Sequence, residues 1–413
     1  MSDGDKLADI LISYGHPHKD KSMAVRALRL SNSNIFNGAL GEVLDEVVTI
    51  ACTHSSPDYK EQYRADAKLI ITNLVAAAFQ AEWMGLGTRI VKGSYLSKMG
   101  FSRRRVENIT TALIQGGSNK YCEPGRAGFL HHGNREKSKT SQYYPSDLLI
   151  KIGAAMLYET VGDFDEYKPY IYKDDNKWDV NEVVNTQVIR DYNEFMRHHT
   201  WAFKAPTVRI LGDVPFTGGR VYTPYQNIVN RRVKVRTQTL LNGEPLVECD
   251  FSSNHPYMLA RLCGVTLASN FYDSIAAAAQ VEKAQVKMVV TRSIGCKNKK
   301  AKGNMMYGLQ AEHMDAETVE RILAEAHRLH PWIEDNSVFF SGKGEYMQWL
   351  EGEIAIKMFS MAVKEAIPMV NIHDAYAVNK VHAGTVTEAM NQYREEVIDT
   401  YKSILSIKRG LVL

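Results

Sequence analysis

The sequence of 413 residues has few cysteines, no long apolar run and almost no excess of charge. Its five cysteines are scattered and form no Cys-x-x-Cys pair, which argues against a disulfide framework or a zinc site. No apolar stretch reaches the roughly 18 residues that span a membrane. The polar N-terminal segment MSDGDK does not resemble a signal peptide. We therefore expect a globular protein of the reducing cytoplasm, with no membrane partner.

The net charge of +3 conceals an uneven distribution of basic residues. Residues 98–139 include nine basic and three acidic residues, and residues 287–302 include six basic residues and no acid. Segregated positive charge attracts polyanions such as nucleic acids, because binding releases their counterions. A solvated helix face is the alternative interpretation of such windows. Composition alone does not decide between the two.

Residues 91–150 have the order of elements of a winged helix-turn-helix. We predict a short helix at Ser94–Met99, a second helix at Arg103–Gln115, and two extended pieces near residues 120–122 and 143–145 around a polar tip. The second helix would be the recognition helix, and nucleic-acid contacts are predicted for the arginines at its start: Arg103, Arg104 and Arg105. A generic helical pair beside a loop is the alternative.

The hydrophobic pattern predicts helices through most of residues 1–90 and mixed α/β structure after Pro206. The strands predicted in the second part are Val208–Leu211, Val233–Thr239, Leu246–Asp250, Met369–Ile372 and Ala375–Val378. The helices predicted there are Tyr257–Leu262, Asp273–Val290, Ala316–His330, Glu345–Ile367 and Gly384–Ser406. A basic helix is also predicted to run through residues 285–310.

Two aspartates stand at the ends of apolar strands, Asp250 in PLVECDFSSNHP and Asp374 in PMVNIHDAYAV. A carboxylate beside a buried strand is costly unless it is paired or binds a metal. Two such groups on one sheet would bind Mg²⁺, which prefers oxygen ligands. An aspartate in a turn at the end of a strand is the simpler explanation of either one alone.

The segment between the two aspartates is rich in Lys and Arg and ends in Tyr307-Gly308. Lys299 precedes Tyr307 by eight residues, about two helical turns, and Arg292 lies about two turns earlier. An ammonium group near phosphates and an aromatic ring near a base are suited to nucleotide selection. The alternative is a basic solvated helix that ends in a Tyr-Gly cap.

The order of these features resembles motifs A, B and C of the family A DNA polymerases and of their relatives, the single-subunit phage and mitochondrial RNA polymerases. The sequence has a carboxylate strand, then Lys-x7-Tyr-Gly, then a His-Asp pair between strands. Three further segments resemble family patterns, namely TGGRVYTPYQNI at 217–228, AHRLHPWI at 326–333 and Gln348 in the helix before His373-Asp374. The resemblance covers residues 217–378 and no part of the first 200 residues.

The resemblance implies a nucleotidyltransferase that uses two metal ions. The metal ligands would be Asp250, Asp374 and the carbonyl of Phe251. They would bind two Mg²⁺ ions, or Mn²⁺ ions instead of Mg²⁺. Lys299 would contact the triphosphate and protonate the leaving group, which makes it catalytic together with the two aspartates. The residues expected around the nucleotide are Phe251, His255, Arg292, Lys299 and Tyr307. The residues expected to contact a DNA template and primer are Arg220, Gln226, Asn227, Gln348 and His373.

The implied fold class is α+β, a right-hand polymerase with an antiparallel palm sheet, helical fingers and a mainly helical N-terminal region. Residues 1–90 would be helical, 91–150 a winged helix and 151–205 a helical connector or thumb. Residues 206–265 would form the first part of the palm, 266–340 the fingers, and 341–413 the second part of the palm and a C-terminal helix.

Departures from the family pattern leave the substrate open. His255 stands where the DNA enzymes have Glu and the RNA enzymes have Gly, and its bulk favours deoxynucleotides. Ala375 after Asp374, and the segment GRVY at 219–222, are closer to the RNA enzymes. We expect a compact DNA-directed DNA polymerase. An RNA polymerase or primase is the first alternative, and a non-catalytic DNA-binding replication or regulatory factor is the second.

Residues 1–240 contain no Asp-x-Glu pair, which is the first metal site of a proofreading exonuclease. We therefore expect no 3′–5′ exonuclease. The family resemblance suggests an enzyme of a phage, plasmid or other mobile element. Such an enzyme would act in the cytoplasm of a bacterial host.

Overall fold

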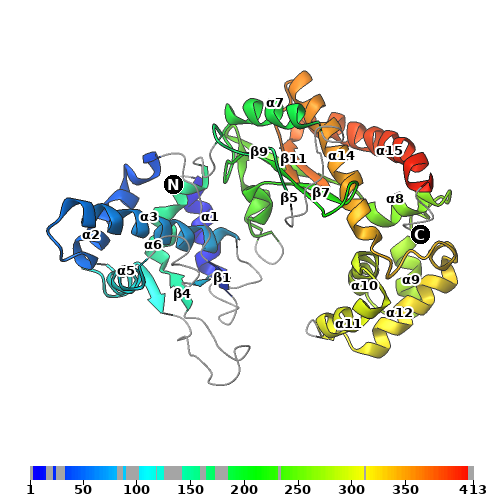
Figure 1. Ribbon diagram of the computed structural model, residues 1–413, viewed down its shortest axis with the longest axis horizontal. Coiled ribbons are helices and arrows are strands. Elements are labelled where there is room, and N and C mark those ends of the chain that lie inside the picture. Colours follow the sequence, from blue (N-terminus) through cyan, green and yellow to red (C-terminus); the bar gives the residue numbers. More distant parts are fainter. Residues whose placement is uncertain are drawn as a thin grey trace.

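A computed structural model describes residues 3–14, 22–24, 33–80, 87–89, 102–117, 119–124, 142–158, 164–172, 185–230, 234–310 and 313–407. The fold is α+β, as expected, with many helices and small sheets (Figure 1). In Figure 1 the N-terminal helices gather on one side, strands β9 and β11 lie near the middle, and helices α9–α12 lie at the other end. Among the described residues, none of the helices has the length and apolarity to cross a membrane.

The N-terminal part is mainly helical, and a small sheet accompanies its helices. The helices are α1 (Asp3–Tyr14), α2 (Ala39–Ala51), α3 (Pro57–Gln80), α5 (Arg103–Gln115) and α6 (Asp147–Gly153), with 3₁₀ turns at Ser33–Phe36 and Ala154–Tyr158. The sheet has the order β1-β2-β4-β3 and consists of β1 (Ser22–Ala24), β2 (Gly87–Arg89), β3 (Cys122–Pro124) and β4 (Gln142–Pro145).

Helix α5 begins where the sequence predicts. The hydroxyl of Ser102 accepts a hydrogen bond from the backbone N–H of Arg105, and Gly116 ends the helix with a φ of +58°. The two extended pieces are present as the antiparallel pair β3 and β4. The predicted helix at Ser94–Met99 lies outside the described residues, so the winged-helix hypothesis stays a prediction.

Arg105 is engaged within the chain. Its Nε lies 2.6 Å from Oδ2 of Asp66, and its Nη1 lies 3.0 Å from Oε1 of Gln62, so it fixes α5 to α3. Arg104 is exposed, and the side chain of Arg103 lies outside the described part of the chain. Of the arginine triplet, the described structure therefore leaves Arg104 on the surface.

The central sheet joins two distant parts of the chain. Its strands are β8 (Leu240–Leu241), β9 (Glu244–Asp250), β10 (Met369–Ile372) and β11 (Ala375–Asn379), in the order β10-β11-β9-β8. All three pairings are antiparallel. Two expected palm segments, 206–265 and 341–413, therefore contribute to one antiparallel sheet.

A second sheet lies beneath helix α14 (Lys343–Lys364) and consists of β5 (Tyr170–Tyr172), β6 (Val208–Leu211) and β7 (Gly218–Tyr222). Strand β5, which is parallel to β6, was not predicted. Gly219 and Gly352 let α14 approach β7 closely, because a Cβ on Gly352 would stand 1.9 Å from the carbonyl oxygen of Gly219.

Helix α7 (Thr186–Arg197) packs on the central body. The ring of Tyr192 stacks on Phe359 of α14 with ring centroids 3.8 Å apart, and its hydroxyl donates to the carbonyl of Met369 at 2.6 Å. Helix α7, within the expected helical connector or thumb at 151–205, is therefore fixed to α14 and β10. The long C-terminal helix α15 (Ala383–Ile407) lies along α14 (Figure 1).

The region between the two halves of the central sheet is helical. Its helices are α8 (Asn254–Leu262), α9 (Phe271–Ala279), α10 (Lys283–Gly295), α11 (Lys302–Gln310), α12 (Ala316–Leu329) and α13 (Trp332–Asp335). Short 3₁₀ turns occur at Pro224–Asn227, Arg236–Gln238, Lys299–Ala301 and Lys380–His382.

Three predicted elements in this half are wrong. The strand predicted at Val233–Thr239 is replaced, over its described part, by the 3₁₀ turn Arg236–Gln238. The helix predicted at Asp273–Val290 is divided, because Gln280 adopts a φ of +51° and a capping box of Glu282 and Gln285 starts α10. The basic helix predicted through residue 310 is interrupted between α10 and α11.

Candidate active site

The two aspartates lie next to each other on the central sheet. Asp250 is the last residue of β9 and pairs in register with Ala375, the first residue of β11. Asp374 directly precedes Ala375 and occupies the two-residue turn between β10 and β11. Both carboxylates line one pocket of about 200 Å³. The sequence motifs therefore identify two residues that the topology brings together.

Backbone strain accompanies both aspartates. His373, just before Asp374, has a φ of +59°, and Ser253, three residues after Asp250, has a φ of +55°. Side chains other than glycine rarely adopt this left-handed conformation, and it costs about 1–3 kcal/mol where it persists. Such strained residues cluster at functional sites. Their position on either side of the carboxylates supports a site at this pocket.

The two carboxylates do not ionise easily without a counter-charge. Burial raises the pKa of Asp374 to about 6, with further contributions from the negative charges of Glu351 and Asp250. Burial also raises the pKa of Asp250, which Lys287 opposes. Acidic groups held close together in a partly dry pocket are stabilised when a cation binds between them.

A third carboxylate, which the sequence did not reveal, is that of Glu351 on α14, which is buried and lines the same pocket. It accepts a hydrogen bond from Nε of Arg220, lies 2.8 Å from Nε2 of His255, and accepts a weaker bond from Asn254 at 3.3 Å. Burial acts to raise the pKa of Glu351, but His255 and Arg220 outweigh it and lower the pKa to about 2. Glu351 is therefore an anion inside the protein.

The cluster that Glu351 forms with Arg220 orients His255 on the pocket wall. Its Nε2 lies near both Glu351 and Nη2 of Arg220, the latter at 3.2 Å. A ring nitrogen cannot donate to the carboxylate and accept from the guanidinium at once. The contact with Glu351 assigns the proton to Nε2, so Arg220 and His255 share one anion. Arg220, expected to contact the duplex, is thus engaged inside the chain.

Helix α10 contributes a cation, Lys287, to the pocket, which Arg220 also lines. Lys287 and Thr291 lie one turn apart on α10 and both line the pocket, together with Tyr272 of α9. Tyr272 is 5% exposed, and its side chain interacts with Ser253 and Thr291. The one indication of this arrangement in the sequence is the spacing of Lys287 and Thr291, a basic residue one helical turn before a hydroxyl residue.

Two of the motif B residues lie away from the pocket. Tyr307 is 77% exposed on α11, and Arg292 faces α11, where its Nη1 lies 3.5 Å from the place of a Cβ on Gly308. Neither Tyr307 nor Arg292 is among the residues that line the pocket. The side chain of Lys299 lies outside the described part of the chain, so its role stays a prediction.

Two lysines of the second basic window, residues 287–302, form ion pairs within the chain. Lys302 contacts Glu320 at 2.6 Å, and Lys297 contacts Glu345 at 3.3 Å. Neither lysine is among the residues that line the pocket. Two lysines of the window at 287–302 are therefore paired with acidic residues of the chain itself.

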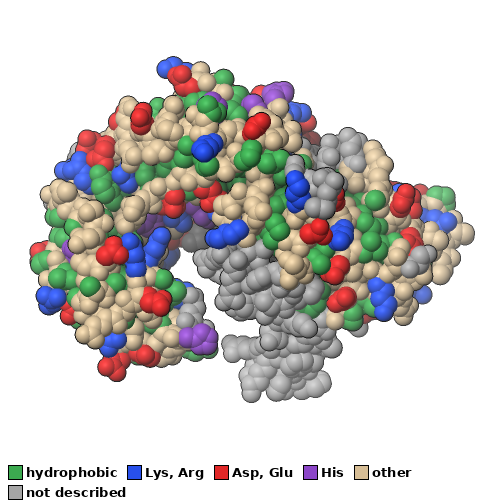
Figure 2. All heavy atoms as spheres, turned by 180° about the vertical axis from the view of Figure 1, so that it is seen from behind, with side chains coloured by type: hydrophobic (Ala, Val, Ile, Leu, Met, Phe, Trp, Pro, Cys, Tyr) green, Lys and Arg blue, Asp and Glu red, His purple; other side chains and the backbone are tan. Residues whose placement is uncertain are grey.

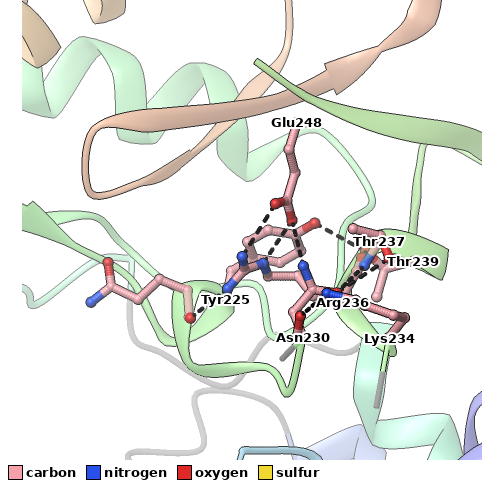
Figure 3. Close-up of polar contacts among 8 residues, drawn as sticks. Tyr225, Asn230, Lys234, Arg236, Thr237, Thr239 and Glu248 are labelled. Carbon is pink, nitrogen blue, oxygen red and sulfur yellow. Dashed lines mark hydrogen bonds and ion pairs between the residues drawn. The ribbon is translucent and has the colours of Figure 1, made fainter. Parts of the chain in front are cut away.

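A polar network fixes the segment after β7 to the strand that carries Asp250 (Figure 3). Glu248 of β9 accepts from Nε of Arg236 at 2.8 Å and from Nη2 at 3.3 Å, while Nη1 of Arg236 donates to the carbonyl of Gln226 at 2.9 Å. In Figure 3, Asn230 and Thr237 lie beside this pair. The network therefore holds the backbone of Gln226 near β9.

The remaining residues expected to contact nucleic acid lie around this network. Asn227 is exposed, whereas Oε1 of Gln226 is buried without a hydrogen-bond partner in the described structure. Gln348 is half-buried on α14, one turn before Glu351. His373 packs its ring edge-on against Tyr222, with ring centroids 5.6 Å apart. Burial, aided by Arg220, lowers the pKa of His373 to about 4, so its ring is neutral.

The described surface is hollowed on the face opposite to that of Figure 1 (Figure 2). Basic, acidic and histidine side chains gather along the wall of this hollow.

The donor set of the pocket fits a hard divalent cation such as Mg²⁺ or Mn²⁺, which prefer oxygen ligands. Within the described ranges, no group of three or more His, Cys, Asp or Glu side chains is placed to hold a metal ion. Three acidic residues line the pocket, namely Asp250, Asp374 and Glu351, and Glu351 is already engaged by Arg220 and His255. Mg²⁺ is usually held by one or two carboxylates and completes its shell with water and substrate phosphates.

Comparisons with protein families, with curated proteins and with solved structures found no match to this chain.

Proposed function

We propose that the chain is a template-directed nucleotidyltransferase of right-hand architecture, most consistent with a compact DNA-directed DNA polymerase without a proofreading exonuclease. The observation that carries the proposal is the pairing of Asp250 with Ala375, which sets two carboxylates side by side in one pocket. A basic helix, α10, faces that pocket with Lys287. The resemblance of residues 217–378 to polymerase motifs supports the same site.

The proposed reaction needs little covalent chemistry from the protein. The 3′-oxygen of a primer bonds to the α-phosphorus of a nucleoside triphosphate, the bond to the pyrophosphate oxygen breaks, and the hydroxyl proton passes to water. Two Mg²⁺ ions, when bound, would activate the hydroxyl and neutralise the phosphates. Asp250, Asp374 and the carbonyl of Phe251 would hold them. Lys287 replaces Lys299 in our proposal as the cation that faces the leaving phosphates.

Primer extension on a defined DNA template tests the proposal. Wild-type chain with Mg²⁺ and deoxynucleotides is expected to extend the primer, and Asp250→Asn and Asp374→Asn to lower the rate about a thousandfold or more, since each removes several kcal/mol of charge stabilisation. Asp273→Asn, an exposed carboxylate paired with Lys283, is the matched control. Extension by both active-site variants at the wild-type rate contradicts a catalytic palm and favours the non-catalytic DNA-binding factor.

The same assay distinguishes the polymerase from the alternative of an RNA polymerase or primase. His255 lines the pocket and is fixed by Glu351, which supports a wall against the ribose 2′-hydroxyl. Ala375, the small residue after Asp374, is what favours the alternative. Preferential use of ribonucleotides without a primer would establish the RNA enzyme, and His255→Gly is expected to relax sugar selection in the DNA enzyme.

A further inference from the structure

Arg394 of α15 is a buried arginine with no ion pair in the described structure. It is 9% exposed, and its guanidinium carbon lies 3.8 Å from the ring centroid of Tyr257 and 4.5 Å from that of Phe251. Its Nη2 donates to Asn391 at 3.0 Å, while its Nε is buried without a hydrogen-bond partner. A buried cation with an unpaired donor is costly where an apolar residue would fill the same space.

The two rings belong to the segment that leaves Asp250. Phe251 is the next residue, is 7% exposed, and its backbone N–H interacts with the Asp250 carboxylate. Tyr257 follows on α8, and its backbone N–H donates to the carbonyl of Ser253, the residue with a positive φ. Arg394 therefore contacts both sides of the strained turn between β9 and α8.

The neighbouring residue strengthens the same contact between helices. Glu395 accepts from the hydroxyl of Tyr257 at 2.6 Å and from Nε of Arg261 at 3.0 Å. These bonds fix α8 to α15 but do not touch Phe251. The stack with Phe251 is the part of the contact that reaches the candidate metal ligands.

We infer that Arg394 is a positioning residue that fixes the turn after Asp250, so that the Asp250 carboxylate and the Phe251 carbonyl are aligned for divalent cations. The inference rests on the proposed function, because it assumes that these groups bind Mg²⁺. The planar guanidinium stacks between two rings and holds their spacing, which the flexible ammonium of lysine cannot do. A methionine fills a similar volume without charge or planarity.

Mn²⁺ binding to the whole chain, measured by electron paramagnetic resonance without nucleotide or DNA, tests the inference. Arg394→Met is expected to weaken binding about tenfold, in the range found when groups that orient metal ligands are removed. Arg394→Lys is expected to weaken it as well, with circular dichroism equal to wild type. Arg261→Met, which removes a contact of Glu395 but not the stack on Phe251, is the matched control and should bind Mn²⁺ as the wild type does.

The possible outcomes separate the inference from the proposed function. If a folded Arg394→Met chain binds Mn²⁺ as tightly as the wild type, Arg394 only fills space. That result overturns the inference but not the proposed function. If the methionine variant does not fold, the lysine variant decides in the same way. A wild-type chain that binds no Mn²⁺ overturns the inference together with the proposed function. With Mg²⁺ and primer extension, the Mg²⁺ concentration for half-maximal rate should rise while the KM for primer–template stays constant.

Discussion

The carboxylate of Glu351 on α14 lies 2.8 Å from Nε2 of His255 on α8. The same carboxylate accepts a hydrogen bond from Arg220 of β7, and its side chain is 1% exposed. One buried anion thus joins the second sheet, the long helix and the turn after Asp250. A buried anion of this kind is stable only while its partners remain, because the desolvation of the ions is compensated by their attraction.

The first prediction concerns the loss of this anion. Glu351→Gln keeps the shape but leaves Arg220 buried beside a neutral amide, and should lower the free energy of unfolding by about 3–5 kcal/mol. Urea unfolding at pH 7.5 measures the change. The control is Glu345→Gln, which breaks a more exposed contact with Lys297 and should cost less than about 1 kcal/mol. Equal effects of the two substitutions would show that the cluster adds no stability.

The second prediction is a pH dependence that arises from Asp374. Its pKa in the folded chain is about 6, above the ordinary 3.8, because burial and two nearby carboxylates oppose its ionisation. The stability that this group contributes is therefore full below pH 3.8 and is lost as the pH rises through 6. Asp374→Asn should then stabilise the metal-free chain by about 1–3 kcal/mol at pH 7.5 and leave it unchanged at pH 4.

Urea unfolding in the presence of EDTA, at pH 4 and at pH 7.5, checks this pH dependence. Added Mg²⁺ should stabilise the wild type at pH 7.5 and remove most of the advantage of the Asn variant, because the cation supplies the missing counter-charge. An Asp374→Asn variant that is equally stabilised at both pH values would show that ionisation of Asp374 is not the cause.

The sequence predicts the strands beside the two aspartates correctly because their signal is local. An apolar strand that leads into Asp is visible in a few residues: β9 ends at Asp250 as predicted, and β10, which ends two residues before Asp374, has the predicted bounds. Glu351 was missed because its role depends on Arg220 and His255, which come from other parts of the chain. An acid within the apolar run MQWLEGEIAIKMF of α14 was the one local signal.

The helix spacing behind the assignment of Lys299 was wrong. That assignment assumed one continuous helix up to Tyr307, but α10 ends at Gly295 and α11 begins at Lys302. Helical spacing holds only within one helix, so the sequence did not indicate that Lys287 of α10 lines the pocket. Strand β5 was missed because only three residues pair with β6, too few for a periodic pattern.

The third prediction distinguishes the two lysines. In the proposed polymerase, Lys287→Ala should raise the KM for the nucleotide or lower kcat, with a total loss in kcat/KM of about 10- to 100-fold, because a charge-assisted contact to phosphate is worth about 1.5–3 kcal/mol. The matched control is Lys283→Ala, on the same helix as Lys287, which removes only a surface ion pair with Asp273 of α9. Steady-state primer extension measures both. A larger loss for Lys299→Ala than for Lys287→Ala would restore the assignment made from the sequence.

The last prediction separates structural from nucleic-acid-binding roles within the arginine triplet. Arg105 lies 2.6 Å from Asp66, whose side chain is buried, so Arg105→Gln should lower the free energy of unfolding by about 1.5–3 kcal/mol. Arg104 is exposed at the start of α5, so Arg104→Gln should leave the unfolding free energy within about 0.5 kcal/mol of wild type.

Binding to duplex DNA, measured at several salt concentrations, gives the complementary result. If α5 meets a phosphate through Arg104, its replacement should weaken binding on all sequences and reduce the slope of log K against log salt by about 1, because one fewer counterion is released. Arg105→Gln should leave that slope unchanged at temperatures where the variant is folded. An unchanged slope for Arg104→Gln would show that Arg104 does not contact a DNA phosphate. No described arginine of the triplet would then support DNA binding by the first basic window, residues 98–139.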